Sequence, residues 1–409
     1  MSSYIKIPKI LLPNEKTDLE KWSVIACDQF TSQEGYWEQL KEYIQDAPST
    51  LNLIFPEVYL NKVDQKEVVK EINAKMKEYL ESNLFNEVNN FIYVERKLTD
   101  TLVRKGLIIC VDLEAYDYSP NAKMPIRATE KTVRERLPVR VEIRKDATLD
   151  LPHICLFMDD IEDKVFGLIK KNKESYNKLY DFELNMNGGH ITGYEVSNSS
   201  EVKKTIDSLL NKELLREKYG IDDELLFVVG DGNHSLATAK ECWNLIKKNL
   251  SEEEIKKHPA RYALCELQNI HDSSIIFEPI HRFLKNANST FIKYLSEHLK
   301  GEGSIRVVYG NKEELISVNK DPTIAIADIQ KSIDDYLLEN DKISLDYIHG
   351  DSHLRELIEK EKGVAIFMPK VEKNTLFDYV VKNGVMPRKS FSIGSAESKR
   401  YYLESQRLY

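Results

Sequence analysis

The stretch ELLFVVGDGNHSLATAKECWNLIKK, residues 224–248, decides the fold. Its apolar run Leu225–Val229 is typical of a buried strand, and the polar loop Gly230–His234 follows directly. Beyond the loop, apolar residues recur at spacings of three and four, which predicts a helix with one buried face: Leu236, Ala239, Trp243 and Ile246. A strand, a glycine-bearing loop and a helix in this order indicate a protein that mixes helices with sheet.

The loop of this stretch fits two interpretations. Gly230 and Gly232 allow a sharp bend with positive φ, and the positive end of the helix dipole would attract an anion. Asp231 could then hold a metal or orient a nucleophile, and His234 could transfer a proton. The other interpretation is a plain helix start with Asn233 or Ser235 as the N-cap. Spacing alone leaves both open.

On either side of this stretch, segments with a strand pattern alternate with segments that have a helical pattern. Apolar runs predict strands at 90–98, 101–116, 151–160, 261–270, 275–284, 304–310, 323–329 and 363–369. Helical spacing predicts helices at 64–84, 163–184, 199–220, 353–360 and 375–384. The helix at 199–220 would begin at an N-cap, Ser199 or Ser200, and end at Gly220. A hairpin reversal is expected at 185–190. We therefore expect an α/β or α+β fold in which mixed sheets with flanking helices form two packed lobes.

The length of 409 residues predicts two or three domains, at about 100–200 residues each. We expect an N-terminal α+β lobe over 1–120 and a central region over 121–300. The central region carries an arginine-rich segment at 127–144 and the sequence DGNHS at 231–235, called the DGNHS box below. The C-terminal α/β segment, 301–409, could pack with the central region into one composite domain.

Composition excludes several classes of protein. Lys and Arg number 58 against 67 Asp and Glu, so the net charge of −9 repels polyanions and nucleic acid is not expected as a partner. No apolar stretch approaches the ~18 residues of a membrane span, and charged residues interrupt the start of the chain, which predicts a cytoplasmic protein without membrane contact. The five cysteines form no CxxC pair, so we expect buried thiols rather than disulfides. The oligomeric state is left open.

Three further groups of cations are candidates for anion binding. The C-terminal group, which fits either an anion-binding lid that folds back or a basic terminal segment, is Arg388, Lys389, Lys399 and Arg400. Five arginines lie within eighteen positions: Arg127, Arg134, Arg136, Arg140 and Arg144. They fit either a solvated surface paired with Glu130, Glu135 and Glu142, or an anion-binding face. His281 and Arg282, which follow Pro279, fit either a surface pair or a second part of the site.

Histidine spacing allows a third alternative, a metal-dependent hydrolase that uses His190, His234 and Asp231. No HxH or HExxH motif supports it. His349 and His353 stand four residues apart, but Gly350 and Asp351 between them are typical of a turn and a helix cap.

Four segments resemble, in order, the blocks of a microbial family called domain of unknown function 1015. GDGNHSLATAK at 230–240 resembles its DGHHR-like box, and the other three are IRATEKT at 126–132, EPIHRFL at 278–284 and MPRKSFSIGSAESKRYYLESQRL at 386–408. The resemblance covers most of the chain, and the family carries no settled function.

The box is also similar, more distantly, to the G-x-H-R signature of the ParB and sulfiredoxin-like superfamily, which includes free-serine kinases. That resemblance implies that Gly232 and His234 contact phosphate and that Asp231 lies beside the reacting group. The arginine of both patterns is replaced here by Ser235, which cannot form a bidentate charged clamp. Arg127 or Arg282 would have to compensate from another segment.

Together these patterns favour a phosphotransferase or phosphatase that acts on a small anionic metabolite, with phosphoserine or serine the first substrates to test. The expected catalytic residues are His234, Asp231 and Glu130, with Asp231 also a metal ligand. The expected phosphate- and substrate-binding residues are Gly230, Gly232, Asn233, Ser235, Arg127, His281 and Arg282. Mg²⁺ and ADP or ATP are the cofactors that fit this chemistry. The alternative is a non-catalytic regulatory protein that binds a nucleotide or metabolite, so enzyme activity itself is left open.

Overall fold

The computed structural model describes residues 3–31, 33–60, 62–132 and 137–409. The chain divides into two compact units. Unit 1 comprises residues 1–128, 132–275 and 396–409, and unit 2 comprises residues 129–131 and 276–395. The predicted boundaries near 120 and 300 stay predictions.

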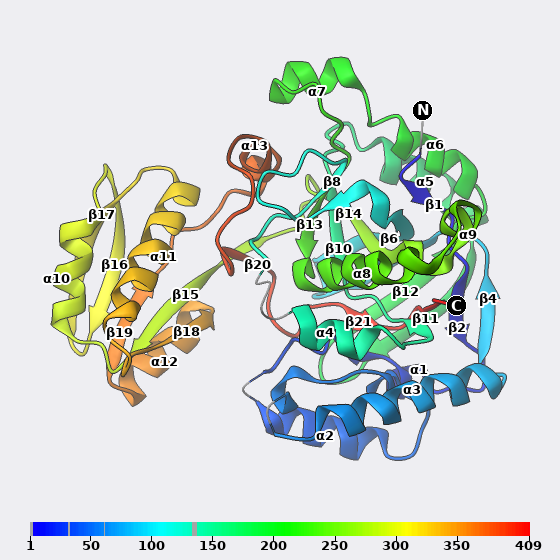
Figure 1. Ribbon diagram of the computed structural model, residues 1–409, viewed down its shortest axis with the longest axis horizontal. Helices are drawn as coiled ribbons and strands as arrows, with labels where there is room; N and C mark the ends of the chain where they lie inside the picture. The colour runs from blue at the N-terminus through cyan, green and yellow to red at the C-terminus, as the bar shows by residue number, and fades with distance from the viewer. Residues whose placement is uncertain (1–2, 32, 61, 133–136) are drawn as a thin grey trace. The chain divides into compact units, whose positions relative to one another are not determined.

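A mixed sheet forms the centre of unit 1 (Figure 1). Within the described residues its strands run in the order β11-β12-β5-β6-β14-β10-β13-β8-β7, with β1 beside β6. Most neighbours are antiparallel, but β10–β14, β13–β8 and β7–β8 are parallel pairs. The strand bounds are β1 Ile5–Lys6, β5 Ile92–Lys97, β6 Val103–Asp112, β7 Tyr116–Asp117, β8 Ile126–Arg127, β10 Cys155–Met158, β11 Asn177–Leu184, β12 Gly189–Glu195, β13 Phe227–Asp231 and β14 Tyr262–Asn269.

Helices and short strand pairs complete unit 1. α4 packs against α8, and α1, α2 and α3 lie together (Figure 1). The helices are α1 Leu19–Trp22, α2 Glu34–Ile44, α3 Gln65–Glu81, α4 Leu137–Arg144, α5 Lys164–Asn172, α6 Ser199–Asp207, α7 Lys212–Tyr219, α8 Asn233–Ile246 and α9 Glu252–Lys257. The short strands are β2 Ile10–Pro13, β3 Val24–Ile25, β4 Phe85–Val88, β9 Leu149–Asp150, β21 Tyr401–Tyr402 and β22 Gln406–Arg407.

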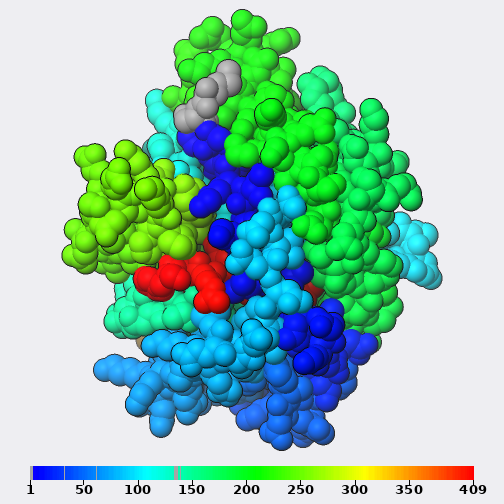
Figure 2. Space-filling model, turned by 90° about the vertical axis from the view of Figure 1, so that its right-hand side faces the viewer, coloured from blue at the N-terminus to red at the C-terminus, as the bar shows by residue number. Residues whose placement is uncertain are grey.

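The segment after residue 395 belongs to unit 1, although unit 2 precedes it in the chain. β21 pairs with β3 and β22 pairs with β9, so this segment adds short ladders to parts of the chain that lie far away in sequence. Figure 2 shows part of it, in red, at the surface against the blue N-terminal segment. Ser405 exchanges main-chain hydrogen bonds with Leu11 at 2.8 and 3.1 Å.

Unit 2 is built on an antiparallel sheet with the strand order β17-β16-β19-β15-β18 and β20 beside β15. Its strands are β15 Phe277–Lys285, β16 Gly303–Tyr309, β17 Lys312–Val318, β18 Ser344–His349, β19 Gly363–Phe367 and β20 Phe391–Ile393. Its helices are α10 Ser289–His298, α11 Pro322–Leu338, α12 Asp351–Lys360 and α13 Leu376–Asn383.

These elements confirm the expected mixed α/β fold and correct three local predictions. Residues 323–329, predicted as a strand, lie in α11, because Asp321 accepts a hydrogen bond from the Thr323 N–H and Pro322 occupies the first helical position. The helix predicted over 163–184 ends at Asn172. Residues 177–184 instead form β11, which is antiparallel to β12 and is joined to it by the turn after Leu184.

The helix predicted over 199–220 is two helices, α6 and α7. The Asn211 side chain caps the second by accepting hydrogen bonds from the N–H groups of Glu213 and Leu214 at 3.0 and 3.3 Å. The N-cap of α6 is Asn198 rather than Ser199 or Ser200. Gly220 ends α7 with a φ of 70°, as expected. The cysteines form no disulfide, and four of the five are buried. No helix in the described part of the chain has both the length and the hydrophobicity that a membrane span requires.

Candidate functional site

The bend from β13 into α8 depends on two glycines. Gly232 is the N-cap of α8 and has a φ of 81°, a conformation that residues with a Cβ rarely adopt. A Cβ on Gly232 would lie 3.1 Å from the Cα of Ile154, and one on Gly230 would lie 2.6 Å from the Phe157 ring. The predicted caps Asn233 and Ser235 are instead the first and third residues of the helix. The glycines therefore let the start of α8 lie against the segment that precedes β10.

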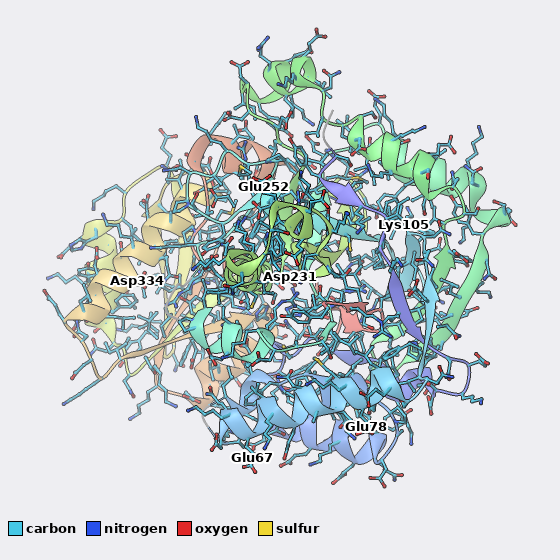
Figure 3. The ribbon with its side chains drawn as sticks, turned by 45° about the vertical axis from the view of Figure 1, so that its right-hand side comes forward. Glu67, Glu78, Lys105, Asp231, Glu252 and Asp334 are labelled. Carbon is cyan, nitrogen blue, oxygen red and sulfur yellow. The ribbon has the colours of Figure 1, made fainter. Side chains whose placement is uncertain are left out.

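Asp231, which Figure 3 labels, ends β13 and forms a charged pair with a residue far along the chain. One carboxylate oxygen, Oδ1, accepts a hydrogen bond from the Gly232 N–H at 2.9 Å. The other, Oδ2, lies 2.8 Å from Nζ of Lys399. Lys399 is 7% exposed, so a buried ammonium group reaches the carboxylate directly before the helix N-terminus.

Two buried arginines hold the segment that carries Lys399. Arg96 on β5 donates hydrogen bonds to the carbonyl oxygens of Gly188, Glu397, Ser398 and Lys399. Its register partner on β6, Arg104, donates through Nη1 to the Ser398 carbonyl at 2.9 Å. Burial lowers the pKa of Arg96 to about 10. These cations fix the main chain at 397–399 and so determine where Lys399 lies.

Arg400, the next residue, is also buried and bridges two acids. It forms ion pairs with Glu266 on β14 and with Glu404, and its Nε donates to the Pro152 carbonyl at 3.2 Å. Although burial opposes ionisation of Glu266, Arg400 is the main influence that keeps the pKa of this carboxyl below its usual value. The contact with Pro152 ties the C-terminal segment to the residues that precede β10.

A second group of side chains meets at the first turn of α8. His153 Nε2 lies 2.8 Å from Ser235 Oγ, and His153 Nδ1 lies 2.8 Å from the Tyr402 hydroxyl. Asp28 Oδ2 lies 3.8 Å from the same Nε2. The Tyr402 hydroxyl also contacts the Cys27 N–H and Sγ, both at 3.2 Å. Segments around residues 27, 153, 235 and 402 therefore build one polar cluster.

The remaining residues of the box, Asn233 and His234, are the first two residues of α8. His234 is half-buried in the first turn of α8, and its carbonyl accepts a hydrogen bond from the Thr238 hydroxyl at 2.7 Å. Asn233 is 7% exposed. The structure thus brings Asp231, Gly232, His234 and Ser235 together, with Lys399 and His153 beside them.

Arg127 is buried and binds main-chain oxygens. Its Nε donates to Met124 at 2.9 Å, and its Nη2 donates to Lys123 and Glu224 at 3.3 Å. Burial lowers its pKa. A role of Arg127 in phosphate binding stays a prediction.

The other arginines of this segment pair with acids that were not expected. Arg140 pairs with Glu57, and Arg144 Nη1 lies 2.6 Å from Asp150. Glu142, a predicted partner, contacts Lys145 instead. Arg134, Glu135 and Arg136 lie outside the described residues.

Three predicted site residues belong to unit 2. Glu130 accepts a hydrogen bond from the Ser390 N–H at 3.0 Å. His281, on β15, pairs through Nε2 with Asp351 at 2.9 Å and accepts the Met368 N–H at Nδ1. Arg282 is fully buried. The roles in phosphate chemistry that the sequence suggested for Glu130, His281 and Arg282 stay predictions.

No group of three or more His, Cys, Asp or Glu that could hold a metal occurs in the part of the chain that the structure describes. His190 lies on β12 between Asp181 and Glu183, at 2.6 and 2.8 Å. His353 Nδ1 contacts the main-chain oxygen of His349. The Asp231 carboxylate already pairs with the Lys399 ammonium group. The Mg²⁺ ion expected on this carboxylate stays a prediction.

A family model described as "Protein of unknown function (DUF1015)" matches residues 9–364. The chain belongs to the DUF1015 family. The match confirms the resemblance to that family and includes three of the four sequence blocks, while the fourth, at 386–408, lies beyond its end. No curated protein matches this DUF1015 chain.

Solved structures match this DUF1015 chain at low identity and with TM-scores below 0.5. A conserved hypothetical protein from Pyrococcus furiosus is 11% identical, with a TM-score of 0.38, and the match covers 74% of this chain and 97% of that one. A free serine kinase in complex with AMP is 11% identical, with a TM-score of 0.41 and coverages of 72% and 90%. SbnI from Staphylococcus aureus, with a C-terminal truncation, is 12% identical, with a TM-score of 0.37 and coverages of 70% and 83%. We take no functional argument from these scores.

The sequence patterns did not identify His153, Tyr402, Asp28 or Lys399 as site residues. His153 stands in the apolar run LPHICLF, and Tyr402 and Lys399 stand in a basic C-terminal segment. Their partners lie 82, 249 and 168 positions away. Two signals were available for the C-terminal segment: it resembled a family block, and its cations fitted an anion-binding lid.

Proposed function

We propose that this protein transfers or hydrolyses the phosphoryl group of a small anionic metabolite at the first turn of α8. The observation that carries the proposal is the contact of 2.8 Å between Lys399 Nζ and Asp231 Oδ2, directly before the helix N-terminus. Phosphoryl transfer depends mainly on positioning and on neutralising the charge of the phosphoryl oxygens. A buried ammonium group and a helix N-terminus supply both.

Local charge supports an anionic ligand. Four buried cations gather around residues 397–400: Arg96, Arg104, Lys399 and Arg400. Their acidic partners are Asp231, Glu266 and Glu404. Among the described residues, the Arg104 Nε is buried and has no hydrogen-bond partner, which costs about 1–3 kcal/mol unless a ligand or water accepts it. This interior attracts a small anion, although the whole chain carries a net charge of −9.

In this proposal each side chain of the box has a distinct role. Lys399 binds the phosphoryl oxygens, and Asp231 orients Lys399 and the Gly232 N–H. His234, in the same turn, donates a proton to the leaving oxygen or takes one from the attacking hydroxyl. The first substrates to test are phosphoserine alone and serine with ATP or ADP as the phosphoryl donor. Each is tested with and without Mg²⁺.

The test is a phosphate-release and phosphoryl-transfer assay on Lys399→Met. We expect at least a ~100-fold loss of kcat/KM, because one charge that stabilises the transition state is removed. Lys257→Met, which removes an exposed lysine paired with Glu253 on α9, is the matched control and should retain full activity. Equal activity of Lys399→Met and the control would refute the assignment. Ligand-dependent stabilisation against heat without any turnover would instead favour a non-catalytic nucleotide- or metabolite-binding protein.

A further inference from the structure

Ser235 has a partner suited to removing its proton. Its Oγ lies 2.8 Å from His153 Nε2, and the His153 side chain is 10% exposed. Ser235 is the third residue of α8, where the helix dipole favours negative charge on a nearby oxygen. A serine hydroxyl within hydrogen-bond distance of an imidazole is the arrangement that activates serine as a nucleophile.

Contacts on the far side of the imidazole are compatible with a base at Nε2. The Tyr402 oxygen accepts the Cys27 N–H, and its hydroxyl lies 3.2 Å from Cys27 Sγ and 2.8 Å from His153 Nδ1. Burial raises the pKa of Cys27 to about 12, so the thiol remains neutral. For Nε2 to act as a base, the proton of the neutral imidazole must lie on Nδ1, from which it is donated to the Tyr402 oxygen at 2.8 Å. Nε2 is then free of a proton and accepts the Ser235 O–H.

The carboxylate of Asp28 complements this arrangement. It lies 3.8 Å from Nε2, the atom that would receive the proton, and would stabilise the imidazolium that forms. Tyr402 is a positioning residue, because it holds the ring through Nδ1, and the two rings meet edge-on at 87°. The group therefore contains a nucleophile, a base, an orienting hydroxyl and a counter-charge.

We propose that Ser235 is a catalytic nucleophile that His153 activates, and that a phosphoserine at position 235 is a covalent intermediate. This inference rests on the proposed phosphoryl chemistry and deepens it. As Ser235 Oγ bonds to phosphorus, its proton moves to His153 Nε2. The bond from phosphorus to the substrate's alcohol oxygen breaks, and that oxygen keeps the electron pair and receives a proton from His234. Water or a second hydroxyl then attacks phosphorus and gives its proton to His234, while the bond from phosphorus to Ser235 Oγ breaks and that oxygen recovers its proton from His153 Nε2.

A serine and an arginine at position 235 would support different chemistry. An arginine at position 235 would clamp an anion but could not attack phosphorus. Serine loses the clamp and gains a nucleophilic oxygen, provided that a base lies beside it. His153 is that base, and Gly232 allows the approach, since a Cβ there would lie 3.1 Å from the Cα of Ile154.

A fluorophosphonate ester tests the nucleophile without knowledge of the natural substrate. Ser235 Oγ would bond to phosphorus, fluoride would leave, and peptide mass mapping would locate the adduct. We expect the full-length protein to be labelled at Ser235 and Ser235→Ala to be unlabelled there. His153→Gln should label at least ~100-fold more slowly, which is the usual contribution of a general base. Added imidazole should restore part of the rate in His153→Ala, an effect that a merely structural histidine would not produce.

The matched control is His190→Gln, which replaces a histidine held by Asp181 and Glu183 on β12 and should label at the wild-type rate. Circular dichroism melting would check that every variant is folded. An unlabelled Ser235 in the wild-type protein, or equal rates for His153→Gln and the control, would overturn the inference. Phosphate turnover that survives in Ser235→Ala would also overturn it and leave the proposed function standing. Labelling at Ser235 with no turnover of any phosphate ester would uphold the nucleophile and refute the phosphoryl chemistry.

Discussion

The DGNHS box at the start of α8 and the EPIHRFL block on β15 both place a histidine beside charged residues, yet they use them differently. At the box, Asp231 and Ser235 contact side chains, Lys399 and His153, that carry charge or move protons. On β15, the guanidinium of Arg282 donates to the carbonyl oxygens of Ile280 and Lys389 and to Gln330. Arg282, the cation in a recognisable motif, therefore donates mainly to main-chain oxygens. The cation at the candidate site, Lys399, comes from a segment far away in the sequence.

Arg282→Met provides the largest expected effect and the most direct way to break this comparison. The change leaves three acceptors in unit 2 without their donor, at about 1 kcal/mol each, so we expect a loss of about 3 kcal/mol in the free energy of unfolding. The three tryptophans, Trp22, Trp37 and Trp243, all lie in unit 1, so unit 2 should be followed by hydrogen exchange of its peptides.

Arg388→Met is the matched control, because Arg388 is half-buried and faces the same Tyr347 ring as Arg282, at 5.4 Å. We expect it to cost less than about 1 kcal/mol. If Arg282→Met left the exchange of unit 2 unchanged and abolished activity, Arg282 would be a ligand-binding residue, and the contrast between the two motifs would be wrong.

Gly232→Ala sharpens the other side of the comparison with an intermediate effect. The left-handed φ of 81° costs an alanine about 1–2 kcal/mol, and the contact with Ile154 at 3.1 Å adds to it. Gly220→Ala has a similar φ of 70° but meets no atom within 4 Å, so it should cost only about 1 kcal/mol and retain activity. Urea unfolding followed by tryptophan fluorescence measures both variants. Equal costs would show that the approach to Ile154 does not constrain the bend.

The smallest effect concerns the pH dependence of His281. Burial lowers its pKa below the ordinary histidine value, although Asp351 opposes the shift and Arg282 and Arg306 add to it. Because the unfolded chain then binds the proton more tightly, His281 lowers stability as pH falls from the ordinary pKa toward the folded one. His281→Gln should therefore be less destabilised, relative to wild type, at about pH 5 than at about pH 7.

His190→Gln should show the opposite sign. Its hydrogen bond with Asp181 raises the pKa of His190, so this histidine adds stability below the ordinary pKa and loses it as pH rises through the folded pKa. Urea titrations at both pH values would measure the two variants side by side. The same sign for both would contradict the assigned environments.

The sequence predicted the strand, loop and helix around residue 231 because hydrophobic spacing and glycines are local signals. It failed at 323–329, where a short apolar run fits strand and helix equally, and the outcome depended on the cap at Asp321 and Pro322. The Lys399 and Tyr402 contacts could not be predicted, because they depend on how β21 pairs with β3 and on the arginines that hold residues 397–399.

Unit 2 is inserted into unit 1, since residues 276–395 separate β14 from the segment that supplies Lys399 and Tyr402. During synthesis the inserted unit emerges in full before the outer unit has all of its strands. The sheet of unit 1 must therefore wait, with Asp231 and Glu266 lacking their cations, until residues 399 and 400 have left the ribosome. A chain arrested between residues 240 and 399 would contain the DGNHS box and lack the charge that we propose makes it active.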